Sequence, residues 1–83
     1  MISKTDKARL EWHCRRGMLE LDLILMPFAR NNLESMSEEQ IKLFDKLLGF
    51  TDPELFSWLM GYELPPEKDI LEIVEFIQLK HQP

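Results

Sequence analysis

Apolar residues recur at helical spacing along nearly the whole chain, and this spacing restricts the possible folds more than any other feature. Leu21, Leu25 and Phe28, for example, stand at positions i, i+4 and i+7, which places them on one face of an α-helix. No segment shows the sustained apolar–polar alternation of a half-buried strand. With 83 residues, the chain has the length of one domain. The sequence therefore predicts an all-α fold, a compact five-helix bundle in a single domain over residues 1–83, ordered from about 5 to 80.

The first two helices are expected to meet at a glycine. The first is predicted at about residues 5–16, where Gly17 suits the C-cap because glycine readily adopts the positive φ that this position often needs. The second begins at about Met18 and ends near residues 31–32, and Pro27 is expected to kink it or to loosen its last turn. Because this segment carries apolar residues on more than one face, we expect it to be the most buried helix.

The third and fourth helices have clear start and stop signals. Residues 37–40, Ser-Glu-Glu-Gln, have the pattern of a capping box, and Gly49 is expected to end the third helix. Asp52 followed by Pro53 predicts the N-cap and the first residue of a fourth helix. Gly61 is expected to end that helix.

The last part of the chain combines an aromatic cluster with a fifth helix. Trp58, together with Phe56 and Met60, has the composition of a flavin- or partner-binding patch, but its helical spacing favours core packing. The fifth helix is predicted from about Glu67, and it is expected to fray from His81 onward.

The distribution of charge excludes some partners. The formal net charge is −5, which disfavours nucleic acid because phosphate contacts require basic residues. Residues 1–17 are nevertheless basic, with five cationic and two acidic residues, and this segment either attracts an acidic partner or reflects ordinary surface variation. The longest apolar run, residues 23–29, is far below the roughly 20 residues that cross a bilayer. The start of the chain also lacks the apolar segment of a secretory signal, so we expect a cytoplasmic protein without membrane insertion.

Few residues are suited to catalysis or metal binding. Cys14 is the only cysteine, and with His13 and His81 it offers too few soft ligands for a zinc site. His13 and Cys14 are adjacent, so on a helix they point about 100° apart, and Cys14 is expected to be a small buried hydrophobe. The three glycines form no phosphate-binding loop. The sequence therefore predicts a protein that is not an enzyme, holds no metal and binds no cofactor stably.

Residues 15–20, Arg-Arg-Gly-Met-Leu-Glu, have an explanation in ordinary helix chemistry. Arg15 and Arg16 favour the C-terminus of one helix, Gly17 ends it, and an acid is favourable in the first turn of the next. Arg16 and Glu20 are also spaced for an ion pair, which contributes about 0–1 kcal/mol when exposed. On this interpretation the segment is a turn and nothing more.

A second interpretation makes the same region a binding surface. Four residues of the first predicted helix share the spacing i, i+3, i+4 and i+7: Arg9, Trp12, His13 and Arg16. Trp and Arg are the residue types most enriched at binding hot spots. Gly17 directly follows this face, and its missing side chain allows a partner's backbone to approach closely. Spacing alone leaves both interpretations open.

The same residues resemble a known family. The run Cys-Arg-Arg-Gly-Met-Leu-Glu-Leu-Asp at residues 14–22, followed by Met-Pro-Phe at 26–28, is similar to the FAD assembly factors of succinate dehydrogenase and fumarate reductase. The hallmark of this family is an R-G-x-x-E motif, which stands here at residues 16–20. Residues 52–61 also resemble the family's pattern. The resemblance spans about residues 5–80, and the length fits the bacterial members.

This resemblance implies a five-helix assembly chaperone. Family members bind the flavoprotein subunit, their client, and promote formation of its histidyl–FAD bond. We expect such a factor to hold the client's flavin and capping domains in an orientation that favours self-flavinylation. The partner-binding residues implied are Arg16, Gly17 and Glu20 from the motif, to which the face argument adds Arg9, Trp12, His13 and Met18. Some relatives have been labelled antitoxin components, so a regulatory protein-binding module of antitoxin type is the alternative function.

Overall fold

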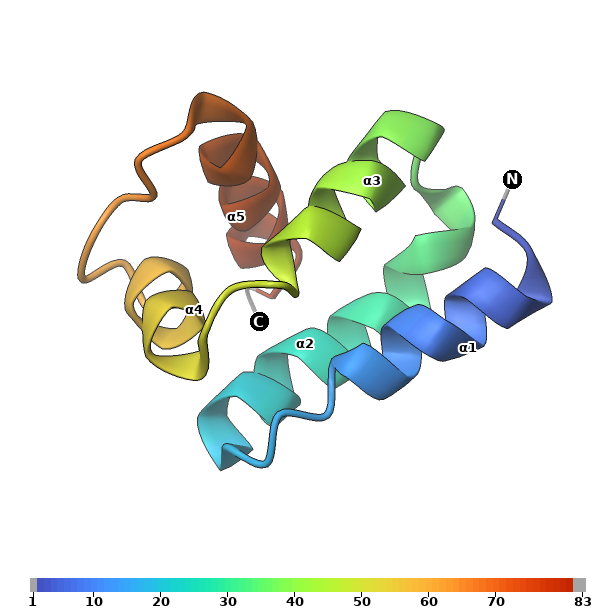
Figure 1. Ribbon diagram of the computed structural model, residues 1–83, viewed down its shortest axis with the longest axis horizontal. Helices are drawn as coiled ribbons and strands as arrows, with labels where there is room; N and C mark the ends of the chain where they lie inside the picture. The colour runs from blue at the N-terminus through green and yellow to red at the C-terminus, as the bar shows by residue number, and fades with distance from the viewer. Residues whose placement is uncertain (1, 82–83) are drawn as a thin grey trace.

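The helical spacing corresponds to five α-helices in the computed structural model, which describes residues 2–81. They are α1 (Lys4–His13), α2 (Leu19–Asn32), α3 (Glu38–Leu47), α4 (Asp52–Leu59) and α5 (Lys68–His81), with a 3₁₀ turn, η1 (Leu33–Ser35), after α2. The described part of the chain contains no β-strand, and its extents are 33 × 26 × 26 Å. The predicted all-α, five-helix fold is therefore confirmed (Figure 1).

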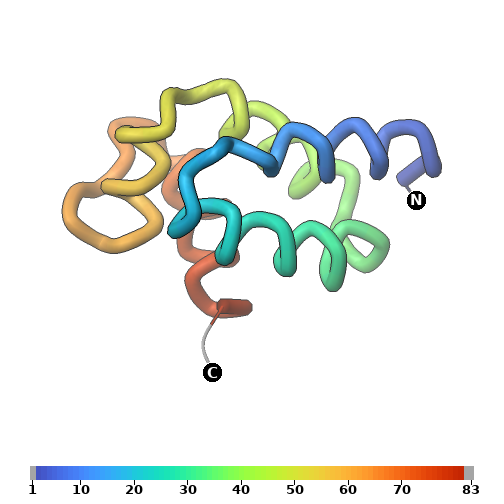
Figure 2. The backbone as a smooth tube through the Cα atoms, turned by 90° about the horizontal axis from the view of Figure 1, so that it is seen from below, coloured from blue at the N-terminus to red at the C-terminus, as the bar shows by residue number. Residues whose placement is uncertain are grey.

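The helices pack in two groups that share α2. α5 packs against α2, α3 and α4, and α1 packs along α2. Figures 1 and 2 show α1 and α2 side by side in opposite directions, joined at one end by a short connection. Because α2 also contacts α4, this helical pair is tied to the second half of the chain.

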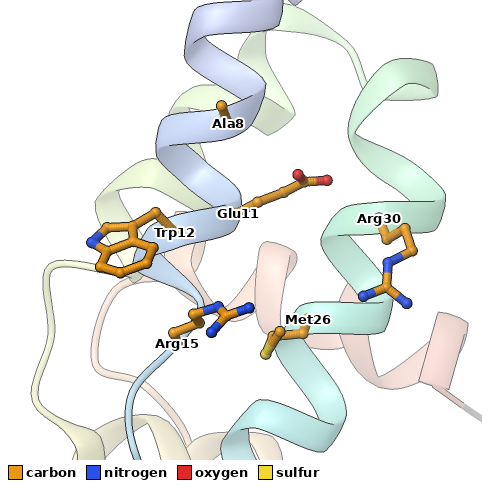
Figure 3. Close-up of a pocket in the computed structure, with 6 residues that line it drawn as sticks. All are labelled: Ala8, Glu11, Trp12, Arg15, Met26 and Arg30. Atoms are coloured by element: carbon orange, nitrogen blue, oxygen red, sulfur yellow. The ribbon is translucent and has the colours of Figure 1, made fainter.

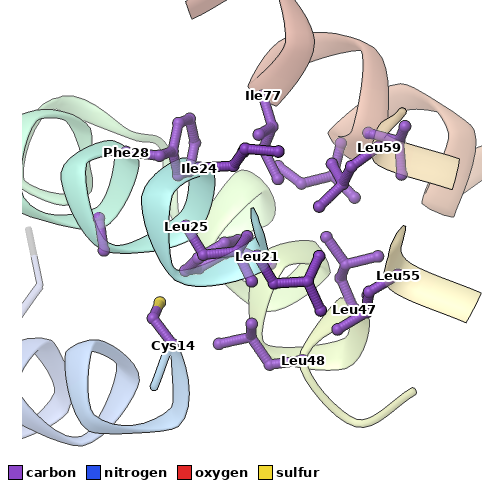
Figure 4. Close-up of a cluster of buried hydrophobic side chains, with 14 of the residues drawn as sticks. Cys14, Leu21, Ile24, Leu25, Phe28, Leu47, Leu48, Leu55, Leu59 and Ile77 are labelled. Atoms are coloured by element: carbon purple, nitrogen blue, oxygen red, sulfur yellow. The ribbon is translucent and has the colours of Figure 1, made fainter. Parts of the chain in front are cut away.

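Aromatic and aliphatic side chains from every helix form the core (Figure 4). Phe44 is fully buried, and its ring centroid lies 5.2 Å from that of Phe28, whose ring meets Phe76 edge-on at 5.8 Å. Trp58 is 6% exposed and packs edge-on against Phe50, with 4.9 Å between the ring centroids. The prediction that Trp58 belongs to the core is therefore confirmed.

The starts of α3 and α4 are both set by capping boxes. The predicted capping box at α3 is confirmed. The Ser37 hydroxyl accepts a hydrogen bond from the backbone amide of Gln40, and the side-chain oxygen of Gln40 accepts one from the backbone amide of Ser37. At α4 the prediction of Asp52 as N-cap is wrong. Thr51 is the N-cap, because it forms a second capping box with Glu54. Asp52 is therefore the first helical residue, and its carboxylate is free to bind another group.

α1 ends three residues earlier than predicted. Its last residue is His13 and its C-cap is Cys14, in place of Arg16 and Gly17. The carboxylate of Asp22 in α2 accepts a hydrogen bond from the backbone amide of Arg16 at 2.8 Å, so the chain has left the helical path before it reaches the glycine. Gly17 has the predicted positive φ, +80°, but it lies in the connection and not at the C-cap.

α2 has a buried and an exposed apolar side. It begins with Met18 as N-cap and continues past Pro27. Its buried residues are Leu21, Ile24, Leu25, Phe28 and Ala29. Leu19 and Leu23, by contrast, are 67% and 59% exposed. α2 was predicted to be the most buried helix. One of its faces is buried in the core, whereas another presents aliphatic side chains to solvent.

The second half of the chain differs little from its prediction. α5 begins at Lys68, next to the expected Glu67, and extends to His81. The fraying was expected from His81 onward. His81 is still part of α5, and residues 82–83 lie outside the described residues. Met60, expected with Trp58 in the core, is 44% exposed because it is the C-cap of α4. Among the helices of residues 2–81, none has both the length and the apolar character needed to cross a membrane.

Candidate functional site

The candidate site is centred on the connection between α1 and α2. Gly17 is exposed there, with a φ of +80°, and a Cβ atom added to it would meet nothing within 4 Å. A side chain at this position would be strained by the backbone conformation, but its Cβ would not be blocked by a neighbour. The glycine therefore leaves the backbone of the connection open to approach from solvent.

Arg16, immediately before this glycine, points into the molecule. Its Nε donates to Asp52 Oδ1 at 2.8 Å, and its two Nη atoms donate to the carbonyl oxygens of Leu48 and Phe50, each at 2.8 Å. A longer bond of 3.3 Å reaches the carbonyl of His13. Only 16% of the Arg16 side chain is exposed. The guanidinium thus joins the α1–α2 connection to the α3–α4 connection and to the first residue of α4.

The physical basis of this contact lies at the end of α3. The carbonyls of Leu48 and Phe50 follow the last turn of α3, where no further helical amides are available to donate to them. A guanidinium is a suitable donor to these carbonyls, because its planar group carries five N–H donors. Its positive charge also interacts favourably with the negative, C-terminal end of the helix dipole. Hydrogen bonds to a charged group contribute about 1.5–3 kcal/mol each. We call Arg16 with Asp52, Leu48 and Phe50 the Arg16 clamp.

The helical face predicted for partner binding keeps three of its four residues, because Arg9, Trp12 and His13 lie on α1 and Arg16 does not. Arg16 lies beyond the end of α1 and turns inward into the clamp. Arg9 faces α3, where its guanidinium donates two hydrogen bonds of 3.2 Å to the carboxylate of Asp45. Trp12 and His13 are exposed at the end of α1. The prediction that Arg16 continues this face is therefore wrong, because α1 ends at His13.

After the glycine, α2 begins with a half-buried methionine followed by exposed side chains on the side away from the core. Met18 is half-buried, and Leu19 and Glu20 are exposed in the first turn of α2. Within residues 2–81 Glu20 has no ion pair, since the arginine expected to bind it is held in the clamp. Leu23 is exposed one turn later. We call Gly17, Met18, Leu19, Glu20 and Leu23 the Gly17–Leu23 surface, which combines an open backbone, large aliphatic side chains and one free carboxylate.

A shallow groove of about 270 Å³ runs between α1 and α2 (Figure 3). Its lining residues are Ala8, Glu11, Trp12, Arg15, Met26 and Arg30. Trp12 is 70% exposed, and the Arg15 guanidinium lies 5.8 Å from its ring centroid, within the range of a cation–π interaction. Trp12 is the one predicted site residue that lines this groove.

Comparison with known proteins places the whole site within one family. The family model described as flavinator of succinate dehydrogenase, Sdh5, matches residues 8–81. The chain belongs to this family. The prediction drawn from residues 14–22 and 52–61 is thereby confirmed, and the R-G-x-x-E motif at residues 16–20 is seen to run from the clamp to the Gly17–Leu23 surface.

Several curated relatives cover nearly all of the chain. The FAD assembly factor SdhE of Legionella pneumophila (strain Lens) is 56% identical over 77 residues, which are 93% of this chain and 96% of the relative. The FAD assembly factor SdhE of Photorhabdus laumondii is 40% identical over 77 residues, 93% of this chain and 88% of the relative. The protein of that name in Idiomarina loihiensis is 43% identical over 72 residues, 87% of this chain and 80% of the relative. The names of these relatives describe an assembly role.

Cys14, the C-cap of α1, is unsuited to nucleophilic or metal chemistry. It is fully buried, and its burial raises the pKa of the thiol to about 12. The thiol is therefore protonated at neutral pH, whereas nucleophilic attack and metal binding require the thiolate. The prediction that Cys14 is a small buried hydrophobe is confirmed. In the part of the chain that the structure describes, no three His, Cys, Asp or Glu residues are grouped to hold a metal ion.

Several residues of the site were missed by sequence reasoning. Asp22 was given no role and Asp52 was expected only as an N-cap, but both bind Arg16. No local pattern could reveal the second contact, because Arg16 and Asp52 are 36 residues apart. For Leu19 and Leu23 a signal did exist, since they stand one turn apart and outside the buried stripe of α2.

Proposed function

We propose that this chain is an FAD assembly factor that binds the flavoprotein subunit of succinate dehydrogenase or fumarate reductase and promotes covalent attachment of its FAD. Membership of the flavinator family supports this proposal, as do relatives named FAD assembly factor that match 93% of the chain. The observation that carries the proposal to particular residues is the Gly17–Leu23 surface. It is open and partly apolar, and it contains the second and last residues of the motif.

The residues predicted for partner binding divide into two roles. Gly17, Met18 and Glu20 contact the client directly, with Trp12 and His13 at the edge of the contact. The accessibility of Trp12 and Gly17 supports this proposal. The Trp12 side chain is 70% exposed, and nothing lies within 4 Å of a Cβ atom added to Gly17. Arg16 acts as a positioning residue, because its donors are already occupied by internal acceptors.

Arg9 has a similar positioning role. Its guanidinium is engaged by Asp45 of α3, and it lies in a different groove from Trp12. It therefore links α1 to α3 through one ion pair, and we assign it no direct contact with the client. This assignment replaces the direct contact that helical spacing suggested.

The proposed mechanism is a shift in the conformations of the client. A binding protein changes such an equilibrium only by the difference in its affinity for the two states. The factor would bind more tightly to the client conformation in which flavin and acceptor histidine are correctly oriented. The acceptor histidine belongs to the client, and FAD is not held stably by the factor. The relatives are bacterial proteins, and the proposed site of action is the bacterial cytoplasm.

The chain offers a matched pair of glycines for testing this proposal. Gly17 and Gly61 have φ of +80° and +81°, and neither has an atom within 4 Å of an added Cβ. Gly17→Arg and Gly61→Arg therefore introduce the same backbone strain, about 1–2 kcal/mol, at two open positions. We expect only Gly17→Arg to abolish covalent flavin in the client, measured by in-gel fluorescence of the denatured flavoprotein subunit. Equal flavinylation with the two variants would contradict the proposed surface.

A second pair tests the free carboxylate. Glu20→Ala removes an exposed acid from the first turn of α2, and Glu39→Ala removes one from the first turn of α3. Both lose a helix-dipole contribution of about 0.3–1 kcal/mol, so their circular dichroism and melting should agree. Flavinylation should fall with Glu20→Ala alone. If the main protein that co-purifies with the wild type is not a flavoprotein, the proposed function is refuted and the antitoxin alternative gains support.

A further inference from the structure

The four arginines of the chain fall into two classes. Arg9 is paired with Asp45, and Arg16 is held in the clamp. Arg15 and Arg30 make no ion pair or side-chain hydrogen bond to any residue in the range 2–81. Both of these free guanidiniums line the groove between α1 and α2 (Figure 3). A protein of net charge −5 therefore places its two unpaired arginines on either side of one groove.

The remaining lining of the groove is mainly apolar. The half-buried Met26 lies between Arg15 and Arg30 in the close-up of the groove, and the exposed indole of Trp12 stands on the side of α1. Glu11 is the single acid among the lining residues. Trp and Arg exposed together are the composition of a binding hot spot, since each combines a large contact area with directed polar groups.

We propose that this groove binds an acidic segment of the flavoprotein client, with a carboxylate between Arg15 and Arg30 and an adjoining apolar side chain against Trp12 and Met26. The inference rests on the proposed function and extends its contact beyond the R-G-x-x-E motif. Arg15 directly precedes the clamp residue and Gly17 in the chain, so the groove and the Gly17–Leu23 surface form one continuous binding face. Guanidinium groups suit this task because they bind carboxylates in a bidentate geometry.

The shape of the groove favours a protein segment over a small molecule. Sites for small ligands are mostly enclosed cavities of about 300–1,000 Å³ that bury most of the ligand. This groove has about 270 Å³ and is partly open to solvent, which is enough for a few side chains of a docked surface. A free dinucleotide such as FAD would remain largely exposed in it. Binding of free FAD in this groove is the competing possibility that the experiment must distinguish.

The test measures the affinity of the full-length chain for the purified flavoprotein subunit of succinate dehydrogenase by titration calorimetry at low and high salt. Arg15→Glu and Arg30→Glu should each weaken binding about 10-fold or more, because each places like charge against the acidic segment. Lys42→Glu is the matched control, since Lys42 is an exposed cation that lines the groove on the other side of α1. Its affinity should stay within about 2-fold of the wild type.

Glu11→Gln gives a result that misfolding cannot imitate. It removes the one carboxylate of the groove, so it should tighten binding by about 2- to 5-fold, with a larger gain at low salt. Unchanged or weaker binding by Glu11→Gln would overturn the inference. So would equal affinities of the Arg15, Arg30 and Lys42 charge-reversal variants for the client. If the wild type fails to bind the flavoprotein at all, the proposed function itself fails.

Two further measurements decide what occupies the groove. FAD alone is titrated against the wild type and followed by flavin fluorescence, and we expect no saturable binding. Saturable binding that Arg30→Glu abolishes would show that the groove takes the cofactor and would overturn the proposed occupant. Sedimentation of the chain alone should give a monomer at micromolar concentration. A dimer that dissociates on Arg30→Glu would assign the groove to a second copy and would likewise overturn the proposal.

Discussion

Replacement of Arg16 is the perturbation whose effect the structure defines most sharply. Arg16→Ala removes three hydrogen bonds of 2.8 Å, to the carboxylate of Asp52 and to the carbonyls of Leu48 and Phe50. It also removes the only ion pair that links the α1–α2 connection to α4 among the described residues. The change should therefore loosen the contact between the two halves of the chain.

The magnitude follows from the burial of the groups involved. Hydrogen bonds to a charged group contribute about 1.5–3 kcal/mol each, but water can replace part of this once the side chain is removed. The Arg16 side chain is 16% exposed and that of Asp52 is 36% exposed, so the loss lies below that of a fully buried pair. Breaking a fully buried pair costs about 3–5 kcal/mol, and we therefore expect Arg16→Ala to destabilise the chain by about 2–4 kcal/mol. For a domain of this size the melting temperature should fall by about 10–30 °C.

Urea unfolding followed by circular dichroism at 222 nm measures this change. Arg15→Ala is the neighbouring control, because the exposed Arg15 side chain makes no ion pair or side-chain hydrogen bond within residues 2–81 and its loss should change the unfolding free energy by less than about 0.5 kcal/mol. A double-mutant cycle with Asp52→Ala should give a coupling of about 1 kcal/mol for the partly exposed pair. If Arg16→Ala and Arg15→Ala unfold at the same urea concentration, the clamp does not stabilise the fold and our reasoning about Arg16 is refuted.

Two more predictions concern the core. Phe44→Ala should destabilise the chain by about 3–5 kcal/mol, because Phe44 is fully buried against Phe28, and urea unfolding with an unchanged m-value would establish this. Cys14 should stabilise the chain through its protonated thiol, since its pKa is raised from 9.0 to about 12 in the native state. Its contribution is complete below pH 9, and above that pH the unfolded state loses the proton first, so stability falls by about 1.4 kcal/mol per pH unit. The difference in unfolding free energy between the wild type and Cys14→Ala, measured from pH 8 to pH 10.5, should show this slope; a constant difference would contradict it.

The positions of the helices were predictable because their signals are local. The capping box at residues 37–40 needs only its own four residues, and it stands in the structure as the sequence indicates. The inward stripe of α2 likewise follows from spacing, since a helix brings residues three and four apart onto one face. Thr51 as the N-cap of α4 was within reach of the same reasoning, because it stands three residues before Glu54 in a capping-box pattern.

The end of α1 was not predictable, because it is decided by contacts distant in sequence. Local chemistry would let the helix continue to Arg16, since no residue before Gly17 interrupts it. Two contacts outweigh that tendency: Asp22 binds the Arg16 amide, and acceptors 32 to 36 residues away bind the guanidinium. For the same reason Arg16 does not extend the face of α1 that carries Arg9, Trp12 and His13.

The structure also explains how both interpretations of residues 15–20 can hold. Gly17 has φ +80°, a conformation that redirects the chain between the inward Arg16 and the outward Glu20. A residue on one side of this turn can therefore stabilise the fold while a residue on the other contacts a client. The two ends of the R-G-x-x-E motif should accordingly fail in different ways. Loss of Arg16 should reduce stability and flavinylation together, whereas loss of Glu20 should reduce flavinylation and lower the melting temperature no more than loss of Glu39 does.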